Sequence, residues 1–133
     1  MEINQVTVPS FTAEITIGLN KGYSNDAWTL NDLKHKLVRA QQKLRDTERI
    51  LLSVKLTLCD IVFLGQDEPS VTLSFINYPK FQIEHQLLKK GVLFIAEQLM
   101  KELNQNRIVI VFKDQTVMLE ASHDIDNNIQ LGL

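Results

Sequence analysis

The chain has 133 residues, a length that fits one compact domain whose core needs no disulfide or metal. Its composition, 44% hydrophobic and 23% charged, is that of a soluble globular protein. The net charge of -2 excludes a global basic field, the single Cys59 excludes an internal disulfide, and no apolar run approaches the ~20 residues that span a bilayer. We therefore expect a cytoplasmic protein with no nucleic-acid or membrane partner.

Residues 1–10 hold a loosely alternating apolar pattern closed by Pro9, which predicts either an edge strand or an ordered arm. Residues 11–19 form the first clear strand, because apolar side chains occupy every second position. Its other face is polar and carries Thr12, Glu14 and Thr16.

A loop with two glycines and two aromatic residues leads from this strand into a helix. Thr29 is placed as the N-cap, and Asp32, three residues later, completes an approximate capping box. Trp28 and Leu33 are placed to form a hydrophobic staple around the cap. Apolar residues then recur at helical spacing as far as Leu44, and lysine and arginine side chains cover the rest of the helix.

Residues 51–64 alternate as a second strand, but the phase slips after Cys59, so that Ile61 falls on the polar side. A β-bulge between Cys59 and the next residue explains the slip most economically. Residues 65–69 (G-Q-D-E-P) predict a turn and residues 71–76 a third strand, so that the two strands form a hairpin.

Pro79 breaks the third strand, and an apolar stripe predicts a second helix from about residue 83 to residue 103. Gly91 lies inside this helix at a cost of ~1 kcal/mol relative to alanine, which the close approach of another backbone would justify. The segment 107–112 (R-I-V-I-V-F) is apolar on both sides, and a strand of that kind is covered on both faces.

The order βαββαβ, with a short extra strand at 116–119 and a mobile polar tail at 121–133, predicts a single α+β domain over residues 1–133. We expect the ferredoxin-like arrangement, an antiparallel sheet with two helices on one face. That fold would leave the strand 107–112 at an edge, where an apolar strand invites pairing with another chain. We therefore expect a homo-oligomer, dimer or higher, formed through this strand or its flank. The alternative is that residues 1–8 or the tail cover the edge internally.

The sequence contains no reaction motif. Its three histidines and one cysteine lie at no metal-ligand spacing, and we expect no metal and no cofactor. Asp67 and Glu68 are expected to be solvated turn residues rather than a paired acid and base. The polar face of the first strand lacks the aromatic residues of RNA-recognition domains, and Glu2 stands where the tautomerase arrangement needs a proline.

Two loop clusters combine aromatic and cationic side chains, which can stack on a planar ring and hold phosphates. The cluster beside the first strand–helix loop contains Lys21, Tyr23 and Trp28, with the 65–69 turn and Arg107 nearby by topology. The cluster at the opposite end contains Tyr78, Lys80 and Phe81, with Arg49 and the Lys113–Asp114 turn. We favour the second cluster as a ligand site. Tyr78 and Phe81 would stack on the ring, and Lys80, with Arg107 or Lys113, would pair with phosphate.

The segments N-Y-P-K-F (77–81) and T-V-M-L-E (116–120) resemble small uncharacterised bacterial and phage-associated α+β proteins of similar length. The pattern is similar to anti-defence proteins that sequester cyclic ADP-ribose-type or cyclic-nucleotide signals. This resemblance implies a non-catalytic oligomer that binds nucleotide signals between its protomers.

We therefore expect a non-catalytic homo-oligomer that binds a nucleotide-like small molecule, as a protein that sequesters a cyclic-nucleotide signal would. The first alternative is an enzyme with an unrecognised site on the open sheet face, using Glu14 or Lys55. The second is a structural or protein-interaction subunit. A buried pocket on the open face would favour the enzyme, and a flat solvated face would not.

Overall fold

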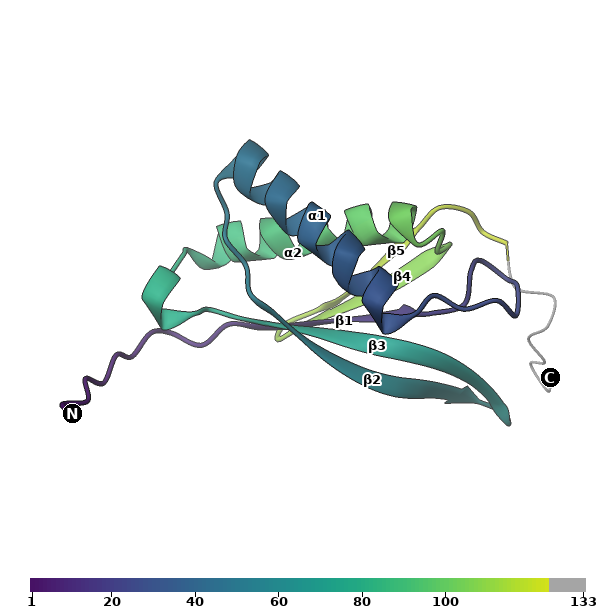
Figure 1. Cartoon of the computed structure of the whole chain (residues 1–133), viewed down its shortest axis with the longest axis horizontal. Coiled ribbons are helices and arrows are strands. Elements are labelled where there is room, and N and C mark those ends of the chain that lie inside the picture. Colours follow the sequence, from purple (N-terminus) through teal and green to yellow (C-terminus); the bar gives the residue numbers. More distant parts are fainter. Residues whose placement is uncertain (125–133) are drawn as a thin grey trace.

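The computed structural model describes residues 1–124, and the outer part of the expected tail, residues 125–133, lies outside the described residues. Over residues 1–124 the fold consists of one sheet and two α-helices (Figure 1). The elements in chain order are β1 (Thr12–Gly18), α1 (Leu30–Glu48), β2 (Val54–Phe63), β3 (Gln66–Ile76), the short 3-10 helix η1 (Pro79–Phe81), α2 (His85–Glu102), β4 (Arg107–Phe112) and β5 (Thr116–Glu120).

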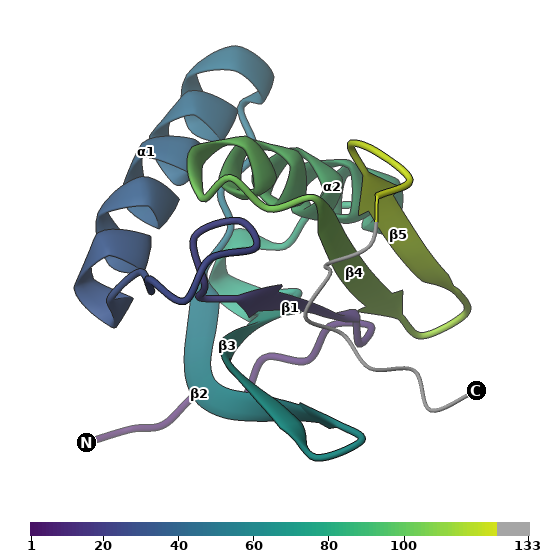
Figure 2. The same ribbon diagram turned by 90° about the vertical axis from the view of Figure 1, so that its right-hand side faces the viewer.

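The sheet has the strand order β2-β3-β1-β4-β5, and every neighbouring pair is antiparallel. Both helices lie on one face of it, and the other face is open (Figures 1 and 2). This confirms the predicted ferredoxin-like arrangement with one extra strand. Among residues 1–124, neither helix is long and apolar enough to cross a membrane.

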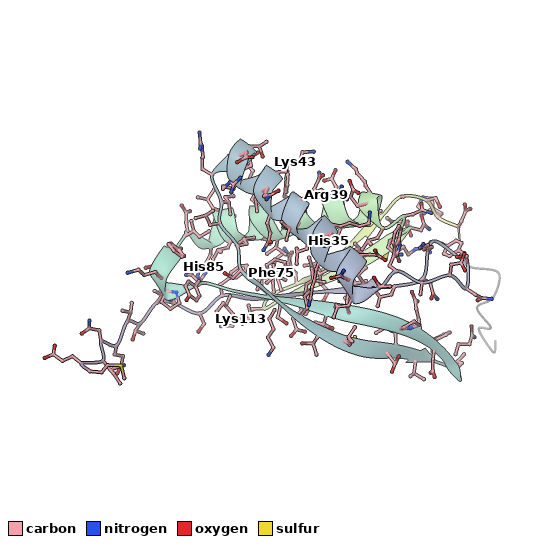
Figure 3. The ribbon with its side chains drawn as sticks, in the orientation of Figure 1. His35, Arg39, Lys43, Phe75, His85 and Lys113 are labelled. Carbon is pink, nitrogen blue, oxygen red and sulfur yellow. The ribbon has the colours of Figure 1, made fainter. Side chains whose placement is uncertain are left out.

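The core lies between the helices and the covered face of the sheet. Each helix contributes one apolar stripe, and each of the three central strands contributes every second side chain, as the periodicity predicts. Phe75 on β3, labelled in Figure 3, is among the largest fully buried side chains. Burying a side chain of this kind contributes about 1.5–3 kcal/mol, so packing rather than helix propensity stabilises the fold.

The start of α1 is held as predicted. The Thr29 hydroxyl accepts a hydrogen bond from the Asp32 backbone at 3.0 Å, and the Asp32 carboxylate accepts one from the Thr29 backbone at 3.0 Å. Trp28 packs on the core, and its indole N–H donates to the carbonyl of Leu103 at 2.9 Å. The entry to α1 is therefore joined to the end of α2.

The β2–β3 hairpin corrects two predictions. β2 and β3 pair without interruption from Val54↔Phe75 to Phe63↔Gln66, so the bulge after Cys59 is absent. The turn consists of Leu64 and Gly65 alone, both at positive φ, while residues 66–69 continue β3. The phase slip has another cause. The outer half of the hairpin extends past the helices (Figure 1), so apolar residues on both of its faces stay exposed.

β4 is an interior strand, so the expectation that residues 107–112 form an open edge was wrong. β1 pairs with one side of β4 and β5 with the other, which leaves β2 and β5 as the edges. Ile108, Ile110 and Phe112 face the core. Val109 and Val111 face the open side, where they are 38% and 49% exposed. Residues 1–11 form no strand and make up an extended arm.

Two further segments are explained by contacts. Gly91 is required by side chains rather than by another backbone, because a Cβ there would lie 2.8 Å from Leu52 Cδ1 and 3.1 Å from Ile50 Cγ2. The first residues of the expected tail are bound to the body of the protein, since Ala121 donates its backbone N–H to the carbonyl of Asn106 at 2.9 Å.

Candidate functional site on the open sheet face

The open face of the sheet carries polar side chains at its centre. The register places Glu14 beside Ser74, Thr16 beside Thr72, and Gly18 beside Ser70. Thr12, Glu14 and Thr16 therefore lie on the open side, as the alternation predicts.

A pocket of about 440 Å³ opens on this face, at the end of the sheet that carries the β1–α1 loop. Its lining is supplied by β1, the loop after β1, the β2–β3 hairpin, and the residues around the start of β4. Segments far apart in the sequence thus meet at one place. The volume lies in the range of small-molecule sites, about 300–1,000 Å³.

Glu68 is the acidic residue of this lining, and its carboxylate lies directly over Gly18. A Cβ at Gly18 would collide with the carboxylate, so the glycine provides the space that the acid occupies. The buried hydroxyl of Ser70 donates to the backbone carbonyl of Glu68 at 3.1 Å. The hairpin therefore holds a half-buried carboxylate against the end of the central strand, β1.

The opposite wall contains Tyr23 and Arg107, which are in contact through the phenol oxygen and Nη1 at 3.4 Å. Arg107 Nε donates to the Glu120 carboxylate at 2.6 Å. This hydrogen bond raises the pKa of Arg107 and lowers the pKa of Glu120 below its ordinary value of 4.5. The guanidinium is thus permanently charged, and its Nε–H is occupied by the hydrogen bond to Glu120.

The pocket combines a carboxylate on one side, a guanidinium and a phenol on the other, and apolar patches from Ile61 and Val109. Such a lining suits a ligand with a cationic group, hydrogen-bonding groups and an apolar body. Within residues 1–124 no group of three or more histidine, cysteine or acidic side chains is placed to hold a metal ion.

The five residues predicted to bind ligand are not brought together. Tyr78 and Phe81 stack with ring centroids 5.9 Å apart and an interplanar angle of 24°, beside a hollow of about 280 Å³, and Lys80 lies on the same turn. Lys113 lines a different hollow of about 310 Å³ near His85 (both labelled in Figure 3). Arg107 lines the open-face pocket at the other end of the sheet. Ligand binding by these residues stays a prediction.

Sequence reasoning found part of the open-face pocket and missed the rest. The proximity of Tyr23 to Arg107 was predicted from topology and is confirmed. Glu68 was placed in a solvated turn because β3 was expected to begin at residue 71. The polar residues Glu68, Ser70, Thr72 and Ser74 alternate at period two, and this signal extends β3 backward far enough to put Glu68 on the open face.

No protein-family model matches the sequence, and no curated protein matches it. Two solved structures share the fold. A phage SAM lyase in its apo state is 18% identical with a TM-score of 0.69. A phage SAM lyase in complex with S-methyl-5'-thioadenosine is 17% identical with a TM-score of 0.65. Each match covers 94% of this chain and 100% of the other chain.

These likenesses correct the functional expectation. The sequence favoured a non-catalytic protein that sequesters a nucleotide signal, whereas both structural neighbours are enzymes, so the non-catalytic interpretation is contradicted. The alternative of an enzyme with a site on the open sheet face fits better. The resemblance to phage-associated proteins is supported, and its extension to cyclic nucleotides is not.

Proposed function

We propose that the protein is an enzyme that binds a nucleoside sulfonium of the S-adenosylmethionine class in the open-face pocket and cleaves a carbon–sulfur bond. The observation that carries this proposal is the pocket itself, in which Glu68 is held over Gly18. The shared fold of the two phage SAM lyases supports the choice of substrate class.

The chemistry of such a substrate matches the lining. S-adenosylmethionine carries an adenosine, a positively charged sulfur, and an amino-acid arm with an ammonium and a carboxylate. Glu68 can attract the cationic groups, and Arg107 can donate to anionic or hydroxyl groups through its remaining N–H groups. Ile61 and Val109 offer apolar surface to the nucleoside.

The charge change during the reaction limits where Glu68 can act. Release of S-methyl-5'-thioadenosine breaks the bond between sulfur and the γ-carbon of the amino-acid arm. The electron pair of that bond goes to sulfur, so the sulfonium charge disappears, and the carboxylate of the arm forms the new carbon–oxygen bond and closes a lactone. A carboxylate against the sulfur would stabilise the substrate more than the transition state. We therefore assign Glu68 to the amino-acid arm, whose ammonium keeps its charge and can be oriented throughout the reaction.

Product analysis tests the proposal. The purified protein is incubated with S-adenosylmethionine, and S-methyl-5'-thioadenosine is quantified by liquid chromatography and mass spectrometry. We expect its release in proportion to protein concentration, and no cleavage of S-adenosylhomocysteine, whose uncharged sulfur is a poor leaving group. Absence of the product above the spontaneous rate would refute the proposal.

Two earlier expectations remain proposals beside this one. We infer that copies of the chain associate through the flank of residues 107–112, because Val109, Val111 and Met118 form exposed apolar surface on the open face. The Tyr78–Phe81 pair, with Lys80, remains a candidate for a second ligand contact.

The single Cys59, a free thiol, suits a reducing cytoplasm.

A further inference from the structure

One wall of the open-face pocket is tied to the segment that follows β5, residues 121–124. This segment runs back from β5 toward the β1–α1 loop (Figure 1). Three residues of the pocket lining, Tyr23, Asn106 and Arg107, make hydrogen bonds to it, and Glu120 contacts its His123. The wall and the segment therefore form one hydrogen-bonded unit.

Asn106 is the centre of this unit. Its Nδ2 lies 2.8 Å from the Tyr23 phenol oxygen and 3.2 Å from each of the backbone carbonyl oxygens of Ser122 and Asp124. Its Oδ1 accepts hydrogen bonds from the Ser122 backbone N–H at 2.9 Å and from the Ser122 hydroxyl at 3.1 Å. An amide has two donor hydrogens and one acceptor oxygen, so the side chain uses both ends fully.

Tyr23 depends on these contacts for its position. Its hydroxyl accepts from Asn106 and donates to the carbonyl of Asp124 at 3.0 Å. Tyr23 is 43% exposed and lies outside the buried core. The β1–α1 loop is held at its base by the Asn20↔Ala27 bridge, which leaves the phenol to be fixed through its hydroxyl.

Arg107 is held by the same segment. Besides its pairing with Glu120, its Nη2 donates to the carbonyl of Ser122 at 3.4 Å. All these hydrogen bonds are exposed or partly buried and therefore compete with water, so they can break while the core stays folded. Residues 121–124 can thus detach from the pocket wall without unfolding of the rest of the protein.

We propose that Asn106 is a positioning residue: by docking residues 121–124 it holds Tyr23 and Arg107 against the pocket, so that substrate affinity depends on a segment outside the pocket lining. This inference rests on the proposed function, because it assigns the pocket wall to substrate binding. Docking of residues 121–124 would therefore increase the affinity of the pocket for its substrate.

The test is a double-mutant cycle on Asn106→Ala and Tyr23→Phe, with Asn31→Ala, an exposed position on α1, as the matched control. Each single variant is expected to raise KM for S-adenosylmethionine about tenfold, with kcat within about twofold. The double variant should raise KM no further than either single change, because both remove the same interaction. The control should behave as the wild type.

Independent, additive effects of the two substitutions, or an unchanged KM in Asn106→Ala, would overturn the inference. A failure of the proposed function is distinguishable, because the wild type would then release no S-methyl-5'-thioadenosine. In that case, hydrogen exchange of residues 20–26 tests whether Asn106 docks the segment. Faster exchange in Asn106→Ala than in Asn31→Ala supports the docking, and equal rates contradict it.

Discussion

At the residue scale, a substitution of Gly18 should disturb the position of the Glu68 carboxylate without destabilising the fold. Gly18 lies in β1 with no positive φ, so alanine is compatible with its backbone, and the three atoms nearest to an added Cβ all belong to the flexible end of Glu68. In Gly18→Ala we expect the carboxylate to be displaced while the free energy of unfolding stays within about 1 kcal/mol of the wild type. Cleavage of S-adenosylmethionine should fall at least about tenfold.

Chemical denaturation and product analysis on the same preparation check this prediction. Gly65→Ala is unsuitable as a control because Gly65 has φ 82. Ser74→Ala, on the open face but outside the pocket lining, is the better one. Full activity in Gly18→Ala would show that the position of the Glu68 carboxylate does not matter.

Glu120 should make the docking of residues 121–124 sensitive to acid. Its folded pKa is lowered, chiefly by the hydrogen bond from Arg107, so its stabilising contribution is complete above the ordinary value of 4.5. That contribution is lost as the pH falls below 4.5 through the folded pKa. We expect hydrogen exchange of residues 121–124 to accelerate over this acidic range in the wild type and to change less in Glu120→Gln.

Asp46 provides the control for this titration, because its pKa is also lowered, by Arg45 on the exposed side of α1. Asp46→Asn should leave the acid sensitivity of residues 121–124 as it is in the wild type. Identical exchange profiles in the wild type and Glu120→Gln would show that neither the ion pair of Glu120 with Arg107 nor its contact with His123 holds the segment.

At the element scale, periodicity predicted every helix and strand whose opposite faces meet different surroundings. α1, α2 and β1 each bury one side and expose the other, and their patterns were interpreted correctly. The outer half of β2 lies beyond the helices, where Leu58, Ile61, Val62 and Phe63 are exposed on both of its faces, so its apolar pattern does not alternate. Glu68 was missed because β3 was expected to begin at residue 71, although its polar alternation extends back to residue 68.

The hairpin turn gives a prediction of its own. Leu64 adopts φ 49 and Gly65 φ 82, the left-handed conformation at both central positions of a two-residue turn. Leucine is disfavoured there by about 1 kcal/mol, whereas asparagine is well suited to it. Leu64→Asn should therefore raise the free energy of unfolding by about 0.5–1 kcal/mol in urea denaturation. A stability loss would mean that the exposed Leu64 side chain is used in a contact.

At the scale of the whole molecule, the order of the strands in the sheet explains why β4 is apolar on both of its faces. β5 covers the edge of β4, so the apolarity of Val109 and Val111 is left on the open face rather than at an edge. Sequence patterns identify strands but not which strand lies beside which, and the position of β5 decided this point.

We predict that copies of the chain associate through the open face around Val109 and Val111. If copies of the chain meet there, light scattering should give a mass above that of the monomer for the wild type and the monomer mass for Val111→Lys. Val38→Lys on α1 is the matched control, because Val38 is 47% exposed and Val111 49%. A wild type that is monomeric at about 100 μM, far above a micromolar Kd, would exclude a stable oligomer.

The central claim is that Glu68 in the open-face pocket serves the cleavage of a nucleoside sulfonium. The most direct measurement is kcat/KM for release of S-methyl-5'-thioadenosine from S-adenosylmethionine by the wild type, Glu68→Gln and Glu14→Gln. Both glutamates lie on the open face, and only Glu68 lines the pocket. We expect a loss of about a hundredfold in Glu68→Gln, from a lost charge-assisted hydrogen bond, and a change within about twofold in Glu14→Gln. Equal activity in Glu68→Gln and the wild type would contradict the account.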